Sequence, residues 1–255
     1  MRRILTSLLI LSLAACGGTD DSDALDADEN TAVSSNEGAL TAELTDDEDA
    51  ATATTSEQVA AAAATRVGSH LTPAGCLTTT VTANTVSYVF DHCTGPRGLL
   101  TLTGTINGVY TLTAPNQVHA VLTSTGFEVN QTTLNLNATI DAVKQGTVKR
   151  AEISSQTTGT GPRGNTVSRA GDYTVSWDSA TACFTLDGTT GSSRLNSTTV
   201  TDFKRCDAKC PVSGTVVHTG PRGNTVTLVY DGSASAQWST SGGRSGTLTL
   251  KCTAN

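Results

Sequence analysis

Apolar and polar residues alternate most clearly between Thr133 and Val143. Every second residue there is apolar, and the residues between them are Thr, Asn or Asp. A strict period of two predicts a strand with one buried and one wet face, as in an antiparallel sheet. The run from Gln117 to Thr125 alternates in the same way and predicts a neighbouring strand.

The sequence Thr-Gly-Pro-Arg-Gly occurs three times, at 94–98, 160–164 and 219–223. A strand-like segment precedes each copy and a second strand follows. A turn signal and a third strand with an aromatic residue then complete each unit. The turn signals are Asn107-Gly108, Ala170-Gly171-Asp172 and Asp231-Gly232. We therefore predict three-stranded meanders whose first connection is the repeated motif.

The repeated motif suits a type I turn, because proline presets φ at the second position and glycine suits the fourth. Arginine at the third position then points into water. A purely structural role explains the motif. The alternative is that Arg97, Arg163 and Arg222 line up along one edge and bind carboxylates or phosphates. A guanidinium group can form two hydrogen bonds to either anion.

Composition favours an all-β fold, because residues 66–255 are dominated by Thr, Ser, Gly and Val. We predict an antiparallel meander that forms a sandwich, an open barrel or a long twisted sheet. One short helix is expected at about 56–67, where Thr54 and Glu57 would form a capping box ahead of the run Ala60–Ala64.

The N-terminus has the features of an export signal. Arg2 and Arg3 precede an apolar stretch, Ile4–Leu13, that is too short to span a bilayer. The sequence Leu13-Ala14-Ala15-Cys16 that follows resembles the lipobox of bacterial lipoproteins. This resemblance implies a signal peptide over 1–15, cleavage before Cys16 and a lipid anchor on that cysteine. Gly17 favours the outer over the inner membrane, and an ordinary secretory signal is the alternative.

Residues 16–57 follow as an acidic linker with thirteen Asp and Glu residues and no Lys or Arg. Low hydrophobicity and self-repulsion predict an extended, disordered tether. Calcium binding by its Asp clusters is the alternative, although no stretch matches an EF-hand loop. The remaining domain, 58–255, has fourteen Lys and Arg against ten Asp and Glu. This mildly basic balance is compatible with polyanionic glycans, and the absence of a basic cluster with aromatics argues against nucleic acid.

Six cysteines remain in the domain, and an even number in an exported domain predicts three disulfides. Spacing favours the pairs Cys76–Cys93, Cys183–Cys206 and Cys210–Cys252. A two-residue loop at Asn84-Thr85 would place Cys76 opposite Cys93. The same register sets Val81 across from Tyr88 and Thr79 across from Phe90, on the face opposite to the disulfide. A metal site built from His92, His218 and some of these cysteines is the alternative, but no second paired cluster supports zinc.

Catalytic patterns are missing from the domain. There is no Gly-x-Ser-x-Gly elbow, and the acids are scattered rather than paired. A Ser-His-Asp triad would need one of the four histidines as its base. These are His70, His92, His119 and His218. We predict no catalytic residue, metal or cofactor.

The overall layout resembles that of Thr/Gly-rich surface lipoproteins of unknown activity from myxobacteria-like organisms. This likeness implies no activity and carries over no functional residue except Cys16. We expect a noncatalytic surface or periplasmic lipoprotein with a structural, adhesive or binding role. Its partners would be the membrane, through Cys16, and surface glycans or other envelope proteins. A small-barrel carrier of lipid-like ligands, or a hydrolase of unrecognised type, is the alternative.

Overall fold

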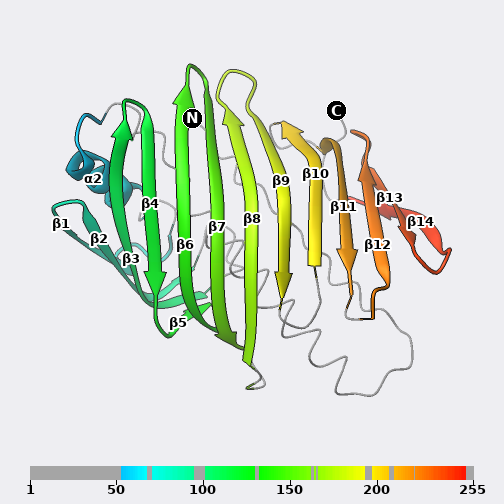
Figure 1. The fold of residues 1–255 in the computed structure, drawn as a ribbon, viewed down its shortest axis with the longest axis horizontal. Coiled ribbons are helices and arrows are strands. Elements are labelled where there is room, and N and C mark those ends of the chain that lie inside the picture. The colour runs from blue at the N-terminus through cyan, green and yellow to red at the C-terminus, as the bar shows by residue number, and fades with distance from the viewer. Residues whose placement is uncertain are drawn as a thin grey trace.

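A computed structural model describes residues 53–67, 71–94, 101–129, 132–161, 164, 166–192, 197–206, 210–220 and 222–250. These residues form one antiparallel sheet of fourteen strands and one helix (Figure 1). The elements in chain order are α2 (Ser56–Val67), β1 (Leu77–Thr82), β2 (Thr85–Thr94), β3 (Thr101–Ala114), β4 (Gln117–Ser124), β5 (Phe127–Val129), β6 (Thr132–Gln145), β7 (Val148–Thr160), β8 (Thr166–Asp178), β9 (Cys183–Ser192), β10 (Ser197–Cys206), β11 (Pro211–Thr219), β12 (Thr225–Tyr230), β13 (Ser235–Thr240) and β14 (Ser245–Thr249). The all-β prediction is confirmed. The signal segment, Cys16 and the acidic linker up to residue 52 lie outside the described residues.

The strands follow one another across the sheet almost in chain order. Only the short strand β5 leaves this path, and it pairs with β3 and β6. Such a meander needs only short hairpin connections, as the frequent Gly and turn residues predict. The path starts at β1 and ends at β14, so the described strands form an open sheet rather than a closed barrel. Figure 1 shows the hairpins at both ends turned away from the central strands. Of the three predicted arrangements, the long twisted sheet is the one observed.

The two faces of the sheet differ as the alternation predicts. In β6 the residues Leu134, Leu136, Ala138 and Ile140 are buried, and those between them face outward. We call the side that carries these apolar residues the inner face and the opposite side the outer face. β4 lies directly beside β6, so the predicted strand at 117–125 and its predicted neighbour are both confirmed.

The helix α2 covers the inner face at the N-terminal end of the sheet, where it contacts β1, β2 and β3. Its predicted bounds are confirmed. The N-terminal cap, however, lies one residue later than predicted: the Gln58 backbone N–H donates to the Thr55 hydroxyl at 3.3 Å, and the Gln58 side chain accepts from the N–H of the preceding residue, Thr54, at 2.7 Å. The hydroxyl of Ser56 also accepts a 2.9 Å bond from the Leu112 N–H, which fixes the helix on β3.

The first hairpin differs from its predicted register. Thr82 pairs with Thr85, so the loop is Ala83-Asn84 rather than Asn84-Thr85. Val81 therefore lies opposite Val86, and Thr79 lies opposite Tyr88. The reason is that Asn84 is held in the loop, where its side-chain amide donates a 2.9 Å bond to the Tyr110 carbonyl.

The Cys76–Cys93 disulfide forms despite this different register, with Cα atoms 5.2 Å apart. A β-bulge between Phe90 and Cys93 adds one residue to β2 opposite β3. One extra residue turns the following side chain to the other face. Cys93 is therefore 0% exposed and shares the core with Tyr88 and Phe90. The prediction that this disulfide lies on the face opposite to those aromatics is wrong.

The other cysteines agree with the spacing as far as the described residues extend. Cys183 and Cys206 are directly opposite in register and form a disulfide. Cys210 is also disulfide-bonded. Its predicted partner, Cys252, lies outside the described residues.

The repeated motif forms a β-turn in its second and third copies. The N–H of Gly164 donates to the Gly161 carbonyl, and that of Gly223 to the Gly220 carbonyl, each at 2.9 Å. The fourth-position glycines have φ of 87° and 75°, values that glycine adopts without steric cost. The turn prediction is therefore confirmed for both copies. In the first copy, residues 95–98 lie outside the described residues.

Two of the three other turn signals are wrong. Asn107-Gly108 lies inside β3, and Ala170-Gly171-Asp172 lies inside β8, whereas Asp231-Gly232 does connect β12 to β13. The two misread glycines allow close packing within the sheet. A Cβ on Gly108 would lie 2.9 Å from the Tyr110 ring, and one on Gly171 would lie 3.2 Å from the Ser155 hydroxyl.

The repeating unit consequently has four strands on the sheet path rather than three. The first unit is β2, β3, β4 and β6, the second is β7–β10, and the third is β11–β14. Each copy of the motif joins the first strand of a unit to the second. Because neighbouring strands are antiparallel and the period is even, all three connections lie at the same end of the sheet. Figure 1 shows this end below the strand pairs β7–β8 and β11–β12.

Candidate functional site

The outer face carries a row of short side chains that crosses the whole sheet. Each member lies directly opposite the next on the neighbouring strand. We call this set the hydroxyl row. Its members, from β1 to β14, are Thr82, Thr85, Val109, Val121, Thr139, Ser154, Asp172, Thr189, Thr199, Val217, Thr227, Ser239 and Ser245.

The hydroxyl row is uniform in shape and almost uncharged. Nine of its thirteen members are Thr or Ser, three are Val, which has the shape of Thr, and one is Asp. Strands about 4.8 Å apart give the row a length of about 58 Å along the curved sheet. Thr189 and Thr199 also contact each other through their hydroxyls, at 3.3 Å. The row therefore presents a regular line of alcohol groups and methyl groups.

A second polar row runs beside the first. It crosses eleven strands in the same residue-by-residue register. Its members are Thr80, Ser87, Asn107, Thr123, Asn137, Gln156, Ala170, Gly191, Ser197, Thr219 and Thr225. It carries no charge at all, so the two rows together make a broad surface with a single charged residue, Asp172, and can donate and accept hydrogen bonds.

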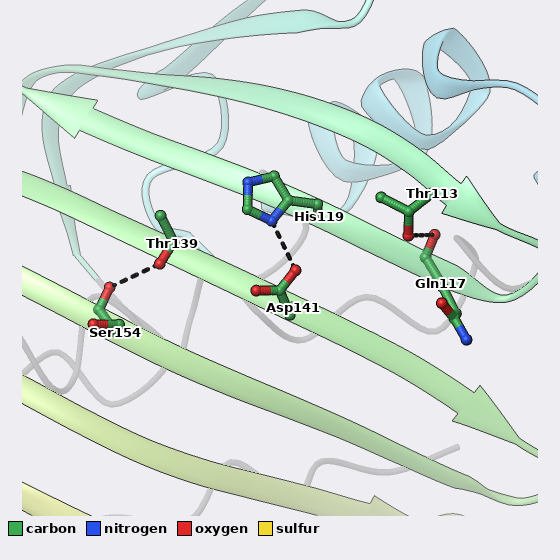
Figure 2. Close-up of polar contacts among 6 residues, drawn as sticks. All are labelled: Thr113, Gln117, His119, Thr139, Asp141 and Ser154. Carbon is green, nitrogen blue, oxygen red and sulfur yellow. Dashed lines mark hydrogen bonds and ion pairs between the residues drawn. The ribbon is translucent and has the colours of Figure 1, made fainter.

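Two acid–base pairs of the outer face lie on the other side of the hydroxyl row, over β4, β6 and β7. Figure 2 shows His119 and Asp141, whose Nδ1 and Oδ1 atoms are 2.7 Å apart. On β7, Arg150 pairs with Glu152 at 2.9 Å. Asp141 and Glu152 lie directly opposite each other, a pairing of like charges that is unfavourable alone. Each acid has its own basic partner, which offsets this repulsion.

The polar contacts around this pair are those of an ordinary sheet surface. The Thr139 hydroxyl donates to the Ser154 carbonyl at 3.5 Å, and the Thr113 hydroxyl to the Gln117 carbonyl at 3.3 Å (Figure 2). Thr111 is the register partner of His119 on β3. No contact joins the described hydroxyl groups to His119. The arrangement therefore offers a hydrogen-bonding surface rather than an activated nucleophile.

The other histidines lie far from this pair and from each other. His92 is in the bulge of β2, where it contacts its neighbour Asp91 at 2.7 Å. His218 is on the inner face of β11, 3.0 Å from the Thr198 hydroxyl, and partial burial lowers its pKa. The metal site considered for His92 and His218 is not assembled, because seven strands of the path lie between β2 and β11. Among the described residues no group of three His, Cys, Asp or Glu could hold a metal ion. His70 lies outside these residues.

The three arginines of the repeated motif are only partly within the described chain. Arg222 lies exposed in the turn before β12, and Arg97 and Arg163 lie outside the described residues. The strands that flank the three motifs end at the same end of the sheet, as the anion-binding hypothesis requires. Successive motifs are four strands apart, about 19 Å at the usual strand spacing. One small anion could not contact two of them at once.

Sequence reasoning identified the hydroxyl-rich strands but missed the rows. The signal in the sequence was the repeated placement of Thr and Ser at every second position of many of the strands. Their alignment depends on the register of thirteen successive strands, which single-strand patterns do not contain.

A scan of family models, a search of curated proteins and a search of solved structures each found no match. No helix among the described residues has the length and apolar character needed to cross a membrane.

Proposed function

We propose that this protein is a lipid-anchored protein of the cell envelope with a noncatalytic binding role, and that its outer face binds extended glycans. The anchor would be Cys16, in the sequence that resembles a lipobox, and the outer membrane is the favoured location. The hydroxyl row is the observation that carries the binding part of this proposal.

The chemistry of the row matches that of a sugar polymer. Alcohol groups both donate and accept hydrogen bonds, so they can pair with sugar hydroxyls in several orientations. The methyl groups of Thr and Val provide apolar contact for the C–H faces of the sugar rings. A row with only one acidic residue also avoids strong repulsion of acidic glycans.

A polymer suits this surface better than a small sugar. Each hydrogen bond to a neutral hydroxyl contributes only about 0.5–1.5 kcal/mol net, so one or two give negligible affinity. A chain that follows several strands makes many such contacts at high effective concentration. The row crosses every strand of the path and is long enough for such a chain.

The test removes hydroxyls from the row without changing its shape. We expect the triple variant Thr189→Val, Thr199→Val, Thr227→Val to lose about tenfold in affinity for insoluble envelope polysaccharide, because three hydrogen bonds disappear. Cosedimentation of the mature protein with purified peptidoglycan and with lipopolysaccharide vesicles measures this affinity. The matched control is the same triple change to Ser, which keeps the hydroxyls and should keep the binding.

Equal binding by the Val and Ser variants would contradict the proposed role of the row, as would failure of the unmodified protein to bind any polysaccharide. Metabolic labelling with palmitate tests the anchor separately. Label must appear in the protein and disappear when Cys16→Ser is introduced.

A further inference from the structure

The strand β14 ends the sheet path and pairs only with β13 among the described strands (Figure 1). The Leu250 N–H donates to the Ala234 carbonyl at 2.9 Å, just beyond the paired residues. Hydrogen-bonded pairs alternate in an antiparallel ladder, so the even-numbered residues of β14 bond to β13. The backbone N–H and C=O groups of Ser245, Thr247 and Thr249 therefore point away from β13, toward the edge of the sheet.

This edge lacks the features by which proteins usually prevent strand pairing. The strand β14 reads Ser-Gly-Thr-Leu-Thr and contains no charged residue and no proline. Its register with β13 is continuous, without a bulge. The described helix, α2, packs at the opposite end of the sheet, against β1, β2 and β3. An open row of N–H and C=O groups without such protection is a template for another strand.

We propose that two copies of the protein associate by antiparallel pairing of β14 with β14, about a two-fold axis that passes through Thr247 perpendicular to the sheet. Thr247 then lies opposite the same residue of the second copy, and Ser245 lies opposite Thr249. The outward backbone groups of all three residues are hydrogen-bonded in this register. Such an interface uses the same surface on both copies and closes after two.

The number of strands favours this dimer over a chain of copies. The path has thirteen strands, each antiparallel to the next, so β1 and β14 run in the same direction. Copies joined end to end with their faces aligned would pair β14 with β1 in parallel, which is slightly less stable per residue. Rotation by 180° in the plane of the sheet also keeps both faces on their own sides, and it gives antiparallel pairing.

The inner face of the edge is complementary to itself under this rotation. Gly246 lies opposite Trp238, and a Cβ on Gly246 would be 2.9 Å from the Trp238 ring. The ring therefore lies over the edge strand, where it is partly exposed. The two-fold axis places Leu248 of the second copy opposite Gly246. That partly exposed side chain would contact the Trp238 ring, and burial of apolar surface favours association.

Charge does not oppose this pairing. Arg244 directly precedes β14 and is exposed. The axis at Thr247 puts the two copies of Arg244 six positions apart along the strand direction, about 20 Å. This separation exceeds the screening length of about 8 Å at physiological salt. The interface is small, so we expect a weak dimer that depends on protein concentration.

Sedimentation velocity of the mature protein tests the proposal, with Cys16→Ser introduced so that lipid does not drive association. We expect a dimer with a dissociation constant between about 10 µM and 1 mM. Thr247→Pro should raise this constant roughly tenfold, because proline removes an outward N–H and leaves the bonds to β13 in place.

The matched control is Thr79→Pro in β1. The Cys76 carbonyl accepts from the Asp91 N–H at 2.9 Å, so the N–H of Thr79 points outward at the other edge of the sheet. This variant should dimerise like the unmodified protein. A loss of association in Thr79→Pro as large as that in Thr247→Pro would overturn the proposal.

A charge exchange tests the two-fold axis itself. Thr247→Lys and Thr247→Glu each place like charges directly opposite one another, so each alone should weaken the dimer about fivefold. An equimolar mixture of the two variants should restore association. A mixture no better than either variant alone would overturn the proposal, as would an unmodified protein that stays monomeric up to about 1 mM. These results do not depend on glycan binding, because the pairing uses the sheet edge.

Discussion

The sheet has two halves that share a strand pattern but differ in their packing. From β1 to β7 the inner face carries one continuous core that includes α2, with Tyr88, Phe127 and Leu122 at 0% exposure. From β8 to β14 the described chain supplies no helix, and only a few apolar side chains are buried, such as Leu186, Phe203 and Ala236. The same four-strand unit therefore forms in both halves, although the described chain supplies a covering helix only in the N-terminal half. Its stability should not be the same in the two settings.

The C-terminal half compensates by contacts within the sheet. Phe203 and Tyr230 meet edge to face, with ring centroids 5.5 Å apart. A Cβ on Gly214 would lie 2.6 Å from the Phe203 backbone, so glycine there allows the close approach of β11 to the bulge in β10. Such neighbour-to-neighbour contacts stabilise hairpins locally, whereas the N-terminal core links elements far apart in the sequence.

The largest expected difference between the halves is in a matched pair of Leu→Ala truncations. Leu122→Ala should cost about 3 kcal/mol because the side chain is fully buried. Leu248→Ala, on the partly exposed edge strand β14, should cost about 1 kcal/mol or less. Urea unfolding measures both free energies. Equal losses would show that the two halves are equally well packed.

The same experiment has a built-in reporter, because both tryptophans, Trp177 and Trp238, belong to the C-terminal half. We expect tryptophan fluorescence to change at a lower urea concentration than the far-ultraviolet circular dichroism. Coincident curves would indicate one cooperative unit.

The disulfides should differ in the order of their reduction. Cys76 and Cys93 are 7% and 0% exposed in the core, whereas Cys183 and Cys206 are partly exposed. Reductant without denaturant should therefore open Cys183–Cys206 first, at a cost of about 2–4 kcal/mol in unfolding free energy. Alkylation followed by peptide mapping gives the order. Earlier loss of Cys76–Cys93 would contradict the packing difference.

The smallest expected effect concerns His218 of the C-terminal half. Partial burial lowers its pKa below the ordinary 6.5, so the unfolded chain binds a proton first as the pH falls. Stability should therefore decrease below about pH 6.5, by less than about 0.5 kcal/mol because solvent screens the charge. His218→Gln should remove this decrease. Melting temperatures of both proteins at pH 7 and pH 5 provide the comparison. If the melting temperature falls by the same amount in both proteins, His218 is not the cause of the decrease.

Local patterns in the sequence predicted the local elements of this fold well. The helix from Ser56 to Val67 and the strand around Leu136 follow from the alanine run and from strict alternation. The bulge before Cys93 did not follow, because one added residue in β2 is visible only against its partner strand. Gly108 was misread as a turn because its role, space for the Tyr110 ring, depends on packing within the folded sheet.

The candidate surfaces were less predictable than the fold. Abundant Thr and Ser indicated polar strand faces. Their alignment into rows, however, depends on how each strand is paired with the next across all the hairpins. The position of Arg169 on the inner face likewise depends on the register of β8 against β7. It also depends on β8 running without a break through the glycine in its middle. Both features belong to the assembled sheet rather than to any one segment.

The four-strand period has a consequence for how such a protein can change in size. Because four is an even number, gaining or losing one unit leaves every remaining strand running in its former direction and every outward residue still outward. The molecule could thus become longer or shorter in steps of about 19 Å while keeping the same two surfaces. Duplication of a unit would lengthen the sheet without changing the kind of residues on its two faces.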